Sequence, residues 1–345
     1  MDLKNQIVII TGAAGFIGAS LAQKLLRKGM NVIGIDNLNN YYEPKLKKDR
    51  IIEIEKTAKK YSSRWKFYEE SIENNKNIKE IFRIEQPSLV VNLAAQAGVR
   101  YSLTNPYAYS STNLLGFGNI LEISRINKVR HIIYASSSSV YGGNKSLPYK
   151  ETHQVNHPVS LYAATKKANE LMAHTYSYIY NIPCTGLRFF TVYGPWGRPD
   201  MAPMIFAKAI LLGEKIQVNN YGKMKRDFTY IDDVTEGIYR CCIKPATPNK
   251  NFDSFNPDPA TSTAPHRIFN IGNNQSINLL EFIQIFEKHL GREASMKMCP
   301  LPEGDVIATE ADTSALKEWI NFQPSTSLDD GLQKFLNWFK NYYQY

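Results

Sequence analysis

Short apolar runs alternate with amphipathic stretches along the first 190 residues of the chain. The first run, Ile7 to Ile10, leads into a glycine-rich turn and then into an amphipathic stretch that ends near Arg27. Apolar runs of four to eight residues are typical of buried strands, whereas apolar positions three and four apart are typical of helices. The same reading predicts strands at 31–35, 88–92, 131–135 and 183–188, and helices at 43–60, 75–85, 106–127 and 160–180.

Repeated strand–helix units predict an α/β fold with a Rossmann-type, doubly wound parallel sheet and helices on both of its faces. Beyond about residue 188 the rhythm changes to Pro- and Gly-rich segments at 194–203 and 245–265, of which 247–265 is expected to be an exposed loop. We expect a nucleotide-binding domain over 1–187 and a smaller α/β substrate domain over 188–345, with part of 229–272 returning to the first domain. Helices are predicted in the second part at 203–212, 278–289 and 328–342.

Composition narrows the class of protein. The 345 residues are 43% hydrophobic and 21% charged, the ordinary balance of a globular protein, and the net charge of +9 favours anionic partners. Residues 43–66 hold nine Lys or Arg, but four acidic residues lie among them at helical spacing, which favours a solvated helix over a nucleic-acid surface.

The remaining composition argues against metal and membrane chemistry. The four cysteines lack metal-ligand spacing and are expected to be reduced thiols of a cytoplasmic protein. The six histidines form no ligand cluster, so we predict no metal site. No stretch approaches the ~20 apolar residues that a membrane span needs.

A candidate cofactor site begins at the first turn. Gly12, Gly15 and Gly18 stand three residues apart where a strand becomes a helix, so the backbone can approach a pyrophosphate. The second apolar run ends at Asp36, eighteen residues past Gly18, where a carboxylate can accept hydrogen bonds from an adenosine ribose. Asp36 repels a 2′-phosphate, and Asn37 follows it where an NADP site tends to offer Arg. The pattern therefore predicts NAD.

Candidate catalytic groups lie on the next predicted elements. Tyr162 and Lys166 are four residues apart and share one face of the predicted helix. A phenol needs its pKa lowered by about 3 units from ~10 to act as a base at neutral pH, and Lys166 together with a positive nicotinamide can supply that stabilisation. The segment Ser136 to Gly142 follows a predicted strand and should place hydroxyl groups at the carboxyl edge of the sheet.

Together, these motifs and Asn92 to Gln96 resemble the extended short-chain dehydrogenase/reductase superfamily. Segments 161–170, 187–201 and 226–233 are similar to the UDP-glucuronate 4-epimerases. The chain departs from the family at Ser71-Ile72, where an Asp usually contacts adenine, and at Asn92, where His is more usual. Related dehydratases and decarboxylases carry acidic residues where this chain has Ser138 and Ser139, so elimination and decarboxylation lack their expected groups.

The resemblance implies roles for individual residues. Ser137, Tyr162 and Lys166 would be the catalytic triad, and Arg226 would bind the substrate pyrophosphate. Arg198 is expected to pair with a sugar carboxylate. The implied cofactor-binding set is Gly12, Gly15, Phe16, Ile17, Gly18, Asp36, Asn37, Leu93, Ala94, Ala95, Gln96, Asn113, Tyr162 and Lys166, and the implied substrate-binding set is Ser138, Ser139, Thr191, Arg198, Met201 and Arg226.

We therefore expect an NAD-dependent 4-epimerase that interconverts UDP-glucuronate and UDP-galacturonate through a 4-keto sugar. The alternatives are a UDP-galactose or UDP-N-acetylhexosamine 4-epimerase, against which Thr191 and Arg198 argue, and a non-catalytic NAD-sensing module, which should have lost Tyr162 and Lys166. A dehydrogenase that releases reduced coenzyme would differ by needing stoichiometric NAD. Apolar side chains on helices 106–127 and 160–180 predict a homodimer through these helices: Tyr107, Leu114, Leu115, Leu171 and Met172.

Overall fold

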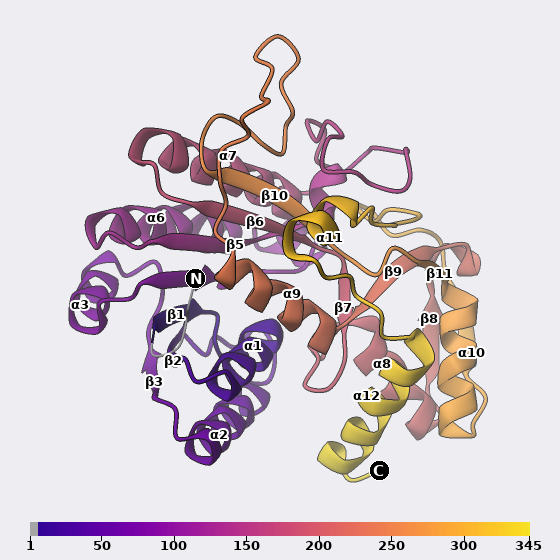
Figure 1. Ribbon diagram of the computed structural model, residues 1–345. Coiled ribbons are helices and arrows are strands. Elements are labelled where there is room, and N and C mark those ends of the chain that lie inside the picture. Colours follow the sequence, from indigo (N-terminus) through magenta and orange to yellow (C-terminus); the bar gives the residue numbers. More distant parts are fainter. Residues whose placement is uncertain (1–5) are drawn as a thin grey trace.

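The structure, a computed structural model, describes residues 6–345 and is built around a seven-stranded parallel sheet (Figure 1). The strand order is β10-β6-β5-β4-β1-β2-β3, with every neighbouring pair parallel. This confirms the predicted doubly wound sheet. Its strands are β1 (Ile7–Thr11), β2 (Asn31–Asp36), β3 (Trp65–Glu69), β4 (Leu89–Asn92), β5 (His131–Ser137), β6 (Cys184–Phe189) and β10 (His266–Ile271).

Two hydrophobic cores form because both faces of the sheet are covered. Val8 and Ile10 of β1 belong to one core, whereas Ile9 between them belongs to the other, and all three are fully buried. Burial on both faces is why a parallel strand reads as a continuous apolar run. The first core includes α1 (Phe16–Arg27), α2 (Pro44–Tyr61) and α9 (Ile231–Ile243); the second includes α3 (Asn75–Glu85), α6 (Phe117–Ile126) and α7 (Leu161–Tyr180).

A smaller region follows residue 190. Strand β9 pairs in parallel with β7 and antiparallel with β11, and β8 pairs in parallel with β12. Figure 1 shows helices α8, α10 and α12 beside these strands. The elements are β7 (Thr191–Tyr193), α8 (Ala202–Leu212), β8 (Lys215–Val218), η3 (Asn219–Gly222), β9 (Lys225–Tyr230), β11 (Ser276–Asn278), α10 (Leu279–Leu290), β12 (Ser295–Met298), α11 (Ser314–Ile320) and α12 (Leu328–Tyr343).

The predicted helix at 106–127 is interrupted. It consists of α5 (Pro106–Tyr109), the π-helical turn η1 (Ser110–Gly116) and α6, and the short α4 (Tyr101–Thr104) precedes it. A π-helical turn inserts a wider hydrogen-bonding step and often marks a functional site. In this interrupted helix Tyr107 and Leu115 are exposed as expected, but Leu114 is only partly exposed. In α7, Leu171 is exposed as expected, whereas Met172 is partly buried against the second core.

Three elements, two strands of the large sheet and one helix packed on it, are not predicted by the hydrophobic pattern. Strand β3 lies at the sheet edge and alternates polar with apolar residues, so it has no continuous apolar run. Strand β10 contains His266 and Asn270, which are buried because they hydrogen-bond to Tyr134 and Tyr141. Helix α9 is the third. Because buried polar pairs interrupt the pattern, strands such as β10 escape a purely hydrophobic reading.

The loop predicted at 247–265 projects from the molecule between α9 and β10, in orange in Figure 1. Phe255 near its tip is almost fully exposed. Within residues 6–345, no helix combines the length and the apolar character needed to cross a membrane.

Candidate active site

The glycine-rich turn after β1 packs against the loop after β4. Gly12 has φ +70°, and a Cβ atom there would lie 2.7 Å from the Ala94 nitrogen. A Cβ on Gly18 would lie 2.1 Å from the Gly12 carbonyl oxygen, so α1 can start this close to the turn only with glycine at that position. Phe16 and Ile17 form the first residues of α1. The turn thus presents backbone and a helix N-terminus at the carboxyl edge of the sheet, as a pyrophosphate site requires.

Asp36 ends β2 beside this turn. Its carboxylate accepts hydrogen bonds from the Ala14 nitrogen at 3.1 Å and from the Leu38 nitrogen at 2.9 Å. Burial raises the pKa of Asp36, and the Lys47 ammonium opposes that effect. Each carboxylate oxygen can accept a second hydrogen bond, so Asp36 is held in place and still able to bind a ribose hydroxyl. Together with the glycine turn, these residues fit the adenosine half of NAD.

The loop Leu93 to Gln96 is tied to its neighbours by a buried hydroxyl and a buried amide. Thr11 Oγ1 donates to Asn92 Oδ1 at 2.7 Å and accepts from the Ala94 nitrogen. Asn113, in the π-helical turn η1, accepts from the Gln96 nitrogen and donates to the Gln96 carbonyl and to Thr165 Oγ1. Both amide hydrogens of Asn113 are therefore used within the protein. These bonds give Asn113 a role in positioning the loop Leu93 to Gln96, and its expected contact with the cofactor stays a prediction.

The predicted triad comes together where β5 meets α7. Ser137 is the last residue of β5, and the turn η2 (Ser138–Tyr141) follows it directly. Its hydroxyl donates to Ser139 Oγ at 3.1 Å and also interacts with the phenol of Tyr162. The Lys166 Nζ donates to the Ala135 carbonyl at 2.9 Å and lies 6.0 Å from the centre of the Tyr162 ring.

Burial dominates the titration of this group. It raises the pKa of Tyr162, and only the Ser137 hydrogen bond and the Arg198 guanidinium oppose it. Burial also lowers the pKa of Lys166 to about 8. The groups of the protein alone therefore do not lower the pKa of the Tyr162 phenol, and the expected lowering by Lys166 together with a positive nicotinamide stays a prediction. A further positive charge beside Tyr162, such as a bound nicotinamide ring, is needed to make it a base.

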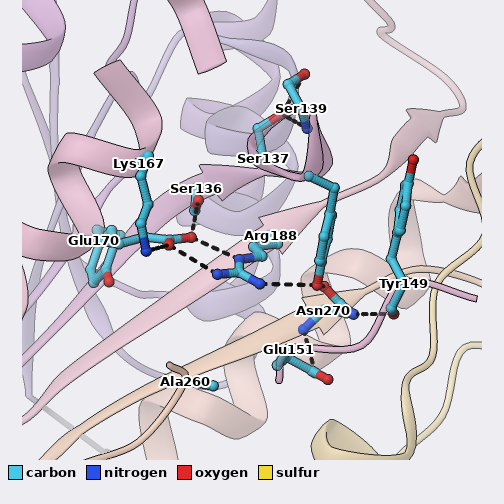
Figure 2. A network of polar contacts seen from close by, with 12 residues as sticks. Ser136, Ser137, Ser139, Tyr149, Glu151, Lys167, Glu170, Arg188, Ala260 and Asn270 are labelled. Carbon is cyan, nitrogen blue, oxygen red and sulfur yellow. Dashed lines mark hydrogen bonds and ion pairs between the residues drawn. The ribbon is translucent and has the colours of Figure 1, made fainter. Parts of the chain in front are cut away.

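A buried ion pair fixes the helix that carries Tyr162 and Lys166 (Figure 2). Arg188 of β6 donates from Nε to Glu170 Oε1 at 2.8 Å and from Nη2 to Oε2 at 3.0 Å, and both side chains are almost fully buried. Ser136 Oγ also donates to Glu170 Oε1, at 2.7 Å. Glu170, one helical turn beyond Lys166, therefore joins α7 to both β5 and β6.

The same network continues to the edge strand of the sheet. Arg188 Nη1 donates to the Tyr141 hydroxyl, which donates to Asn270 Oδ1 at 2.7 Å. The backbone nitrogen of Asn270 donates to Glu151 Oε1, as Figure 2 shows. Burial raises the pKa of the Glu151 carboxyl to about 7, although the Asn270 hydrogen bond works against it. A carboxyl group that titrates near neutrality thus ends the network.

The expected substrate residues lie on the strands and loops around the triad. Ser138 and Ser139 belong to the turn η2, Thr191 begins β7, and Met201 precedes α8. Arg198, in the loop between β7 and α8, is close enough to Tyr162 for its charge to act on the phenol. Arg226 lies on β9.

The two arginines expected to bind substrate already hold carboxylates of the protein, which the sequence did not predict. Arg198 donates from Nε and Nη2 to the two carboxylate oxygens of Asp200, at 3.0 and 2.6 Å. Arg226 donates to Asp305 Oδ1 at 2.6 Å and to the Ile307 carbonyl oxygen. Each cation is oriented by its own partner, so the net charge of +9 does not act here as an unpaired positive field.

Sequence reasoning missed the residues that hold the site. Arg188 is a charged residue inside an apolar run, and Glu170 lies four residues after Lys166. These two features of the sequence could have revealed the ion pair, because a buried cation requires an acidic partner. Asp200 follows Arg198 by two residues, but Tyr41, whose hydroxyl donates to Asp200 at 3.0 Å, lies 159 residues away and carries no comparable signal.

The chain is similar to a described family and to curated proteins. A family model described as "NAD dependent epimerase/dehydratase family" matches residues 8–272. Protein CapI of Staphylococcus aureus is 51% identical over 337 residues, 98% of this chain and 99% of that protein. UDP-glucuronate 4-epimerase 4 of Arabidopsis thaliana is 42% identical over 341 residues, 97% of this chain and 76% of that protein.

The chain is also similar to a solved structure. The crystal structure of UDP-glucuronic acid 4-epimerase from Bacillus cereus in complex with UDP-glucuronic acid and NAD matches with a TM-score of 0.86 at 31% identity, covering 98% of this chain and 100% of that chain. This overlap covers both the large sheet and the smaller region after residue 190.

Removing the arginine of the buried pair should destabilise the protein strongly. Arg188→Met leaves Glu170 buried without its main partner, which costs about 3–5 kcal/mol of the free energy of unfolding. Lys167→Ala is the control, because the Lys167 Nζ is 3.4 Å from Glu170 and its loss should cost less than about 1 kcal/mol. Urea unfolding monitored by circular dichroism measures the free energy of unfolding of both variants. Equal, small losses would show that the pair is not a main constraint.

Glu151 should make stability depend on pH. Its folded pKa of about 7 lies above the ordinary value of 4.5, so the folded state binds the proton more tightly. The stabilisation is complete below about pH 4.5 and is lost as the pH rises through 7. Relative to Glu151→Gln, the wild-type protein should therefore lose about 2–3 kcal/mol of unfolding free energy between pH 5 and pH 8. Parallel pH profiles of the two proteins would contradict the assignment.

Proposed function

Since the chain belongs to the NAD dependent epimerase/dehydratase family, we propose that it is an NAD-dependent 4-epimerase that interconverts UDP-glucuronate and UDP-galacturonate. One observation carries the proposal: Tyr162, Ser137 and Lys166 meet at the carboxyl edge of the sheet, with the Arg198 guanidinium close enough to act on Tyr162. The Arabidopsis thaliana relative and the Bacillus cereus structure, both UDP-glucuronate 4-epimerases, support the choice of a UDP-uronate over other UDP-hexoses.

The residues that would hold NAD are the glycine turn, Asp36 with Asn37, and the loop Leu93 to Gln96. When bound, NAD supplies a reversible hydride acceptor and the positive charge of its nicotinamide ring. The pocket contributes burial, which strengthens the effect of any charge brought next to Tyr162.

Tyr162 and Ser137 handle the proton of the reaction. We assign Tyr162 as the base that takes the proton of the sugar C4 hydroxyl, and Ser137 as the hydroxyl that shares this proton with the phenol. Lys166 holds the end of β5 through the Ala135 carbonyl and adds its charge beside the Tyr162 ring. After the 4-keto sugar has turned, Tyr162 would return the proton to the C4 oxygen.

The substrate-side residues recognise the two anionic parts of the sugar nucleotide. Arg226 would hold the pyrophosphate and Arg198 the C6 carboxylate, with Ser138, Ser139, Thr191 and Met201 around the sugar. The carboxylate also matters chemically, because the 4-keto intermediate is a β-keto acid that can lose CO₂. Holding the carboxylate out of alignment with the ketone suppresses that loss.

The surface and the thiols support two further assignments. Tyr107 of α5, Leu115 of η1 and Leu171 of α7 are 85%, 58% and 59% exposed, which supports a homodimer through these helices. The four cysteines are free thiols, as is typical of cytoplasmic proteins, and we assign the protein to that compartment.

The purified protein should convert UDP-glucuronate to UDP-galacturonate without added NAD, because the coenzyme is regenerated in each cycle. Tyr162→Phe should lose activity by about 10²–10⁴-fold while it still retains NAD, since the change removes the proton acceptor and little volume. Chromatographic separation of the products and the NAD content of denatured protein measure the two effects. Unchanged substrate with NAD-loaded wild-type protein would favour a non-catalytic NAD-binding module.

Arg198→Ala tests the choice of sugar. We expect a loss of about 2–4 kcal/mol of transition-state stabilisation, roughly 30- to 1000-fold in kcat/KM for UDP-glucuronate, with a much smaller loss for UDP-glucose. Some UDP-pentose should also accumulate, because the carboxylate is no longer held. Steady-state rates with both substrates decide the matter. Equal losses on the two sugars would mean that Arg198 only holds its loop in place.

The proposed dimer predicts a mass of twice the 39.3 kDa chain by light scattering at micromolar concentration. Leu171→Glu on α7 should convert it to the monomer, because it places a charge in the middle of the apolar contact. Ile84→Glu is a matched control on α3, outside these helices, where a half-exposed apolar side chain is also replaced by a charge. A wild-type protein of monomeric mass refutes the dimer.

A further inference from the structure

Arg198 is held by one edge of its guanidinium. Asp200 takes the Nε and Nη2 donors of that edge, and the two side chains are only 22% and 32% exposed. A guanidinium has five N–H donors in a fixed plane and can therefore bind a second carboxylate through its Nη1–Nη2 end. Among residues 6–345, Asp200 is the hydrogen-bond partner of Arg198, and its bonds leave Nη1 unused. The end that suits a bidentate carboxylate is thus available.

Asp200 is in turn fixed by a residue from the cofactor side of the molecule. The Tyr41 hydroxyl donates to Asp200 Oδ2 at 3.0 Å. The Tyr41 ring packs against Tyr101 with 4.9 Å between ring centres. Its hydroxyl also lies against Gly98, where an added Cβ would be 2.6 Å away. Tyr41 therefore occupies a defined position between the loop after β4 and Asp200.

A chain of side-chain turns connects Tyr41 to Asp36. Asp36 Oδ1 accepts from the Leu38 nitrogen, Asn37 Oδ1 from the Asn39 nitrogen, and Asn39 Oδ1 from the Tyr41 nitrogen, at 2.9, 3.2 and 3.3 Å. The Lys47 ammonium ties the same segment down through the Asn39 carbonyl and side-chain oxygens, each at 2.7 Å. Asx turns of this kind fix the local backbone. The path from Asp36 to Tyr41 is short, and three hydrogen bonds, each between residues two positions apart, hold it.

We propose that Tyr41 and Asp200 are positioning residues for substrate selection, which hold Arg198 by one edge so that its free end meets the C6 carboxylate of a UDP-uronate. The inference rests on the proposed function, in which Arg198 binds that carboxylate. Through the segment 36–41, the same two residues link the carboxylate site to the carboxylate that binds the cofactor ribose.

The paired state of Arg198 decides how recognition works. Asp200 offsets part of the positive charge of Arg198, so the selectivity depends mainly on the direction of the N–H donors. Loss of orientation should therefore weaken uronate binding more than removal of the Asp200 charge strengthens it. A competing role, in which the substrate carboxylate displaces Asp200 from Arg198, predicts the opposite sign.

The test measures binding of two sugars that differ at C6. Calorimetry gives the Kd of UDP-glucuronate and of UDP-glucose for NAD-loaded protein that also carries Tyr162→Phe, so that neither sugar turns over. In this background Tyr41→Phe and Asp200→Asn should each weaken UDP-glucuronate 10- to 100-fold and change UDP-glucose less than threefold. Tyr101→Phe is the matched control, because it removes a phenol that contacts Asn105 and not Asp200, and both Kd values should stay within threefold.

A double-mutant cycle separates this inference from the proposed function. When Arg198→Ala is present, Asp200→Asn should have no further effect on the preference for UDP-glucuronate. Tighter binding of UDP-glucuronate by Asp200→Asn, equal weakening of both sugars, or unchanged Kd values would each overturn the positioning role. A preference lost in Arg198→Ala but kept in Tyr41→Phe and Asp200→Asn overturns this inference alone. A preference that survives Arg198→Ala contradicts the assignment of Arg198 in the proposed function.

Discussion

The buried ion pair between Glu170 and Arg188 is the constraint on which the active site depends. Each charge would be costly alone, and the pair is tolerated because two direct hydrogen bonds and those of Ser136 and Tyr141 satisfy it. Glu170 fixes α7 against two strands at once, so the face of α7 that carries the phenol and the ammonium has one position relative to the end of β5. The triad is therefore placed by a pair that takes no part in the chemistry.

Without ligands, burial disfavours charge on Tyr162 and Lys166, and ion pairs hold the charges of the two arginines. Burial raises the pKa of Tyr162 and lowers that of Lys166, which disfavours the charged form of both. Arg198 and Arg226 keep their charge, but each is held by a carboxylate. A low-dielectric site of this kind responds strongly to charges that the ligands bring. In the proposed reaction, the coenzyme ring activates the base and the substrate anions meet arginines that are already oriented.

The sequence predicts the candidate catalytic residues better than the residues that hold them in place. The large sheet, most helices and the meeting of Tyr162 with Ser137 follow from apolar runs and short motifs, because local spacing determines them. Strand β10 and the contact from Tyr41 to Asp200 do not, since they depend on polar pairs between residues more than a hundred positions apart. Asn113 shows the same limit: the family resemblance implies the residue, but only the structure shows that its amide is bonded within the protein.

In the proposed reaction, hydride would leave C4 and return to the same carbon, with Tyr162 handling the proton. UDP-glucuronate deuterated at C4 tests this most directly, with the products analysed by NMR and mass spectrometry. We expect UDP-galacturonate that keeps the deuterium at C4, no label in the solvent, and no conversion by Tyr162→Phe. Loss of the deuterium to solvent, or its appearance in released coenzyme, would contradict the proposed reaction.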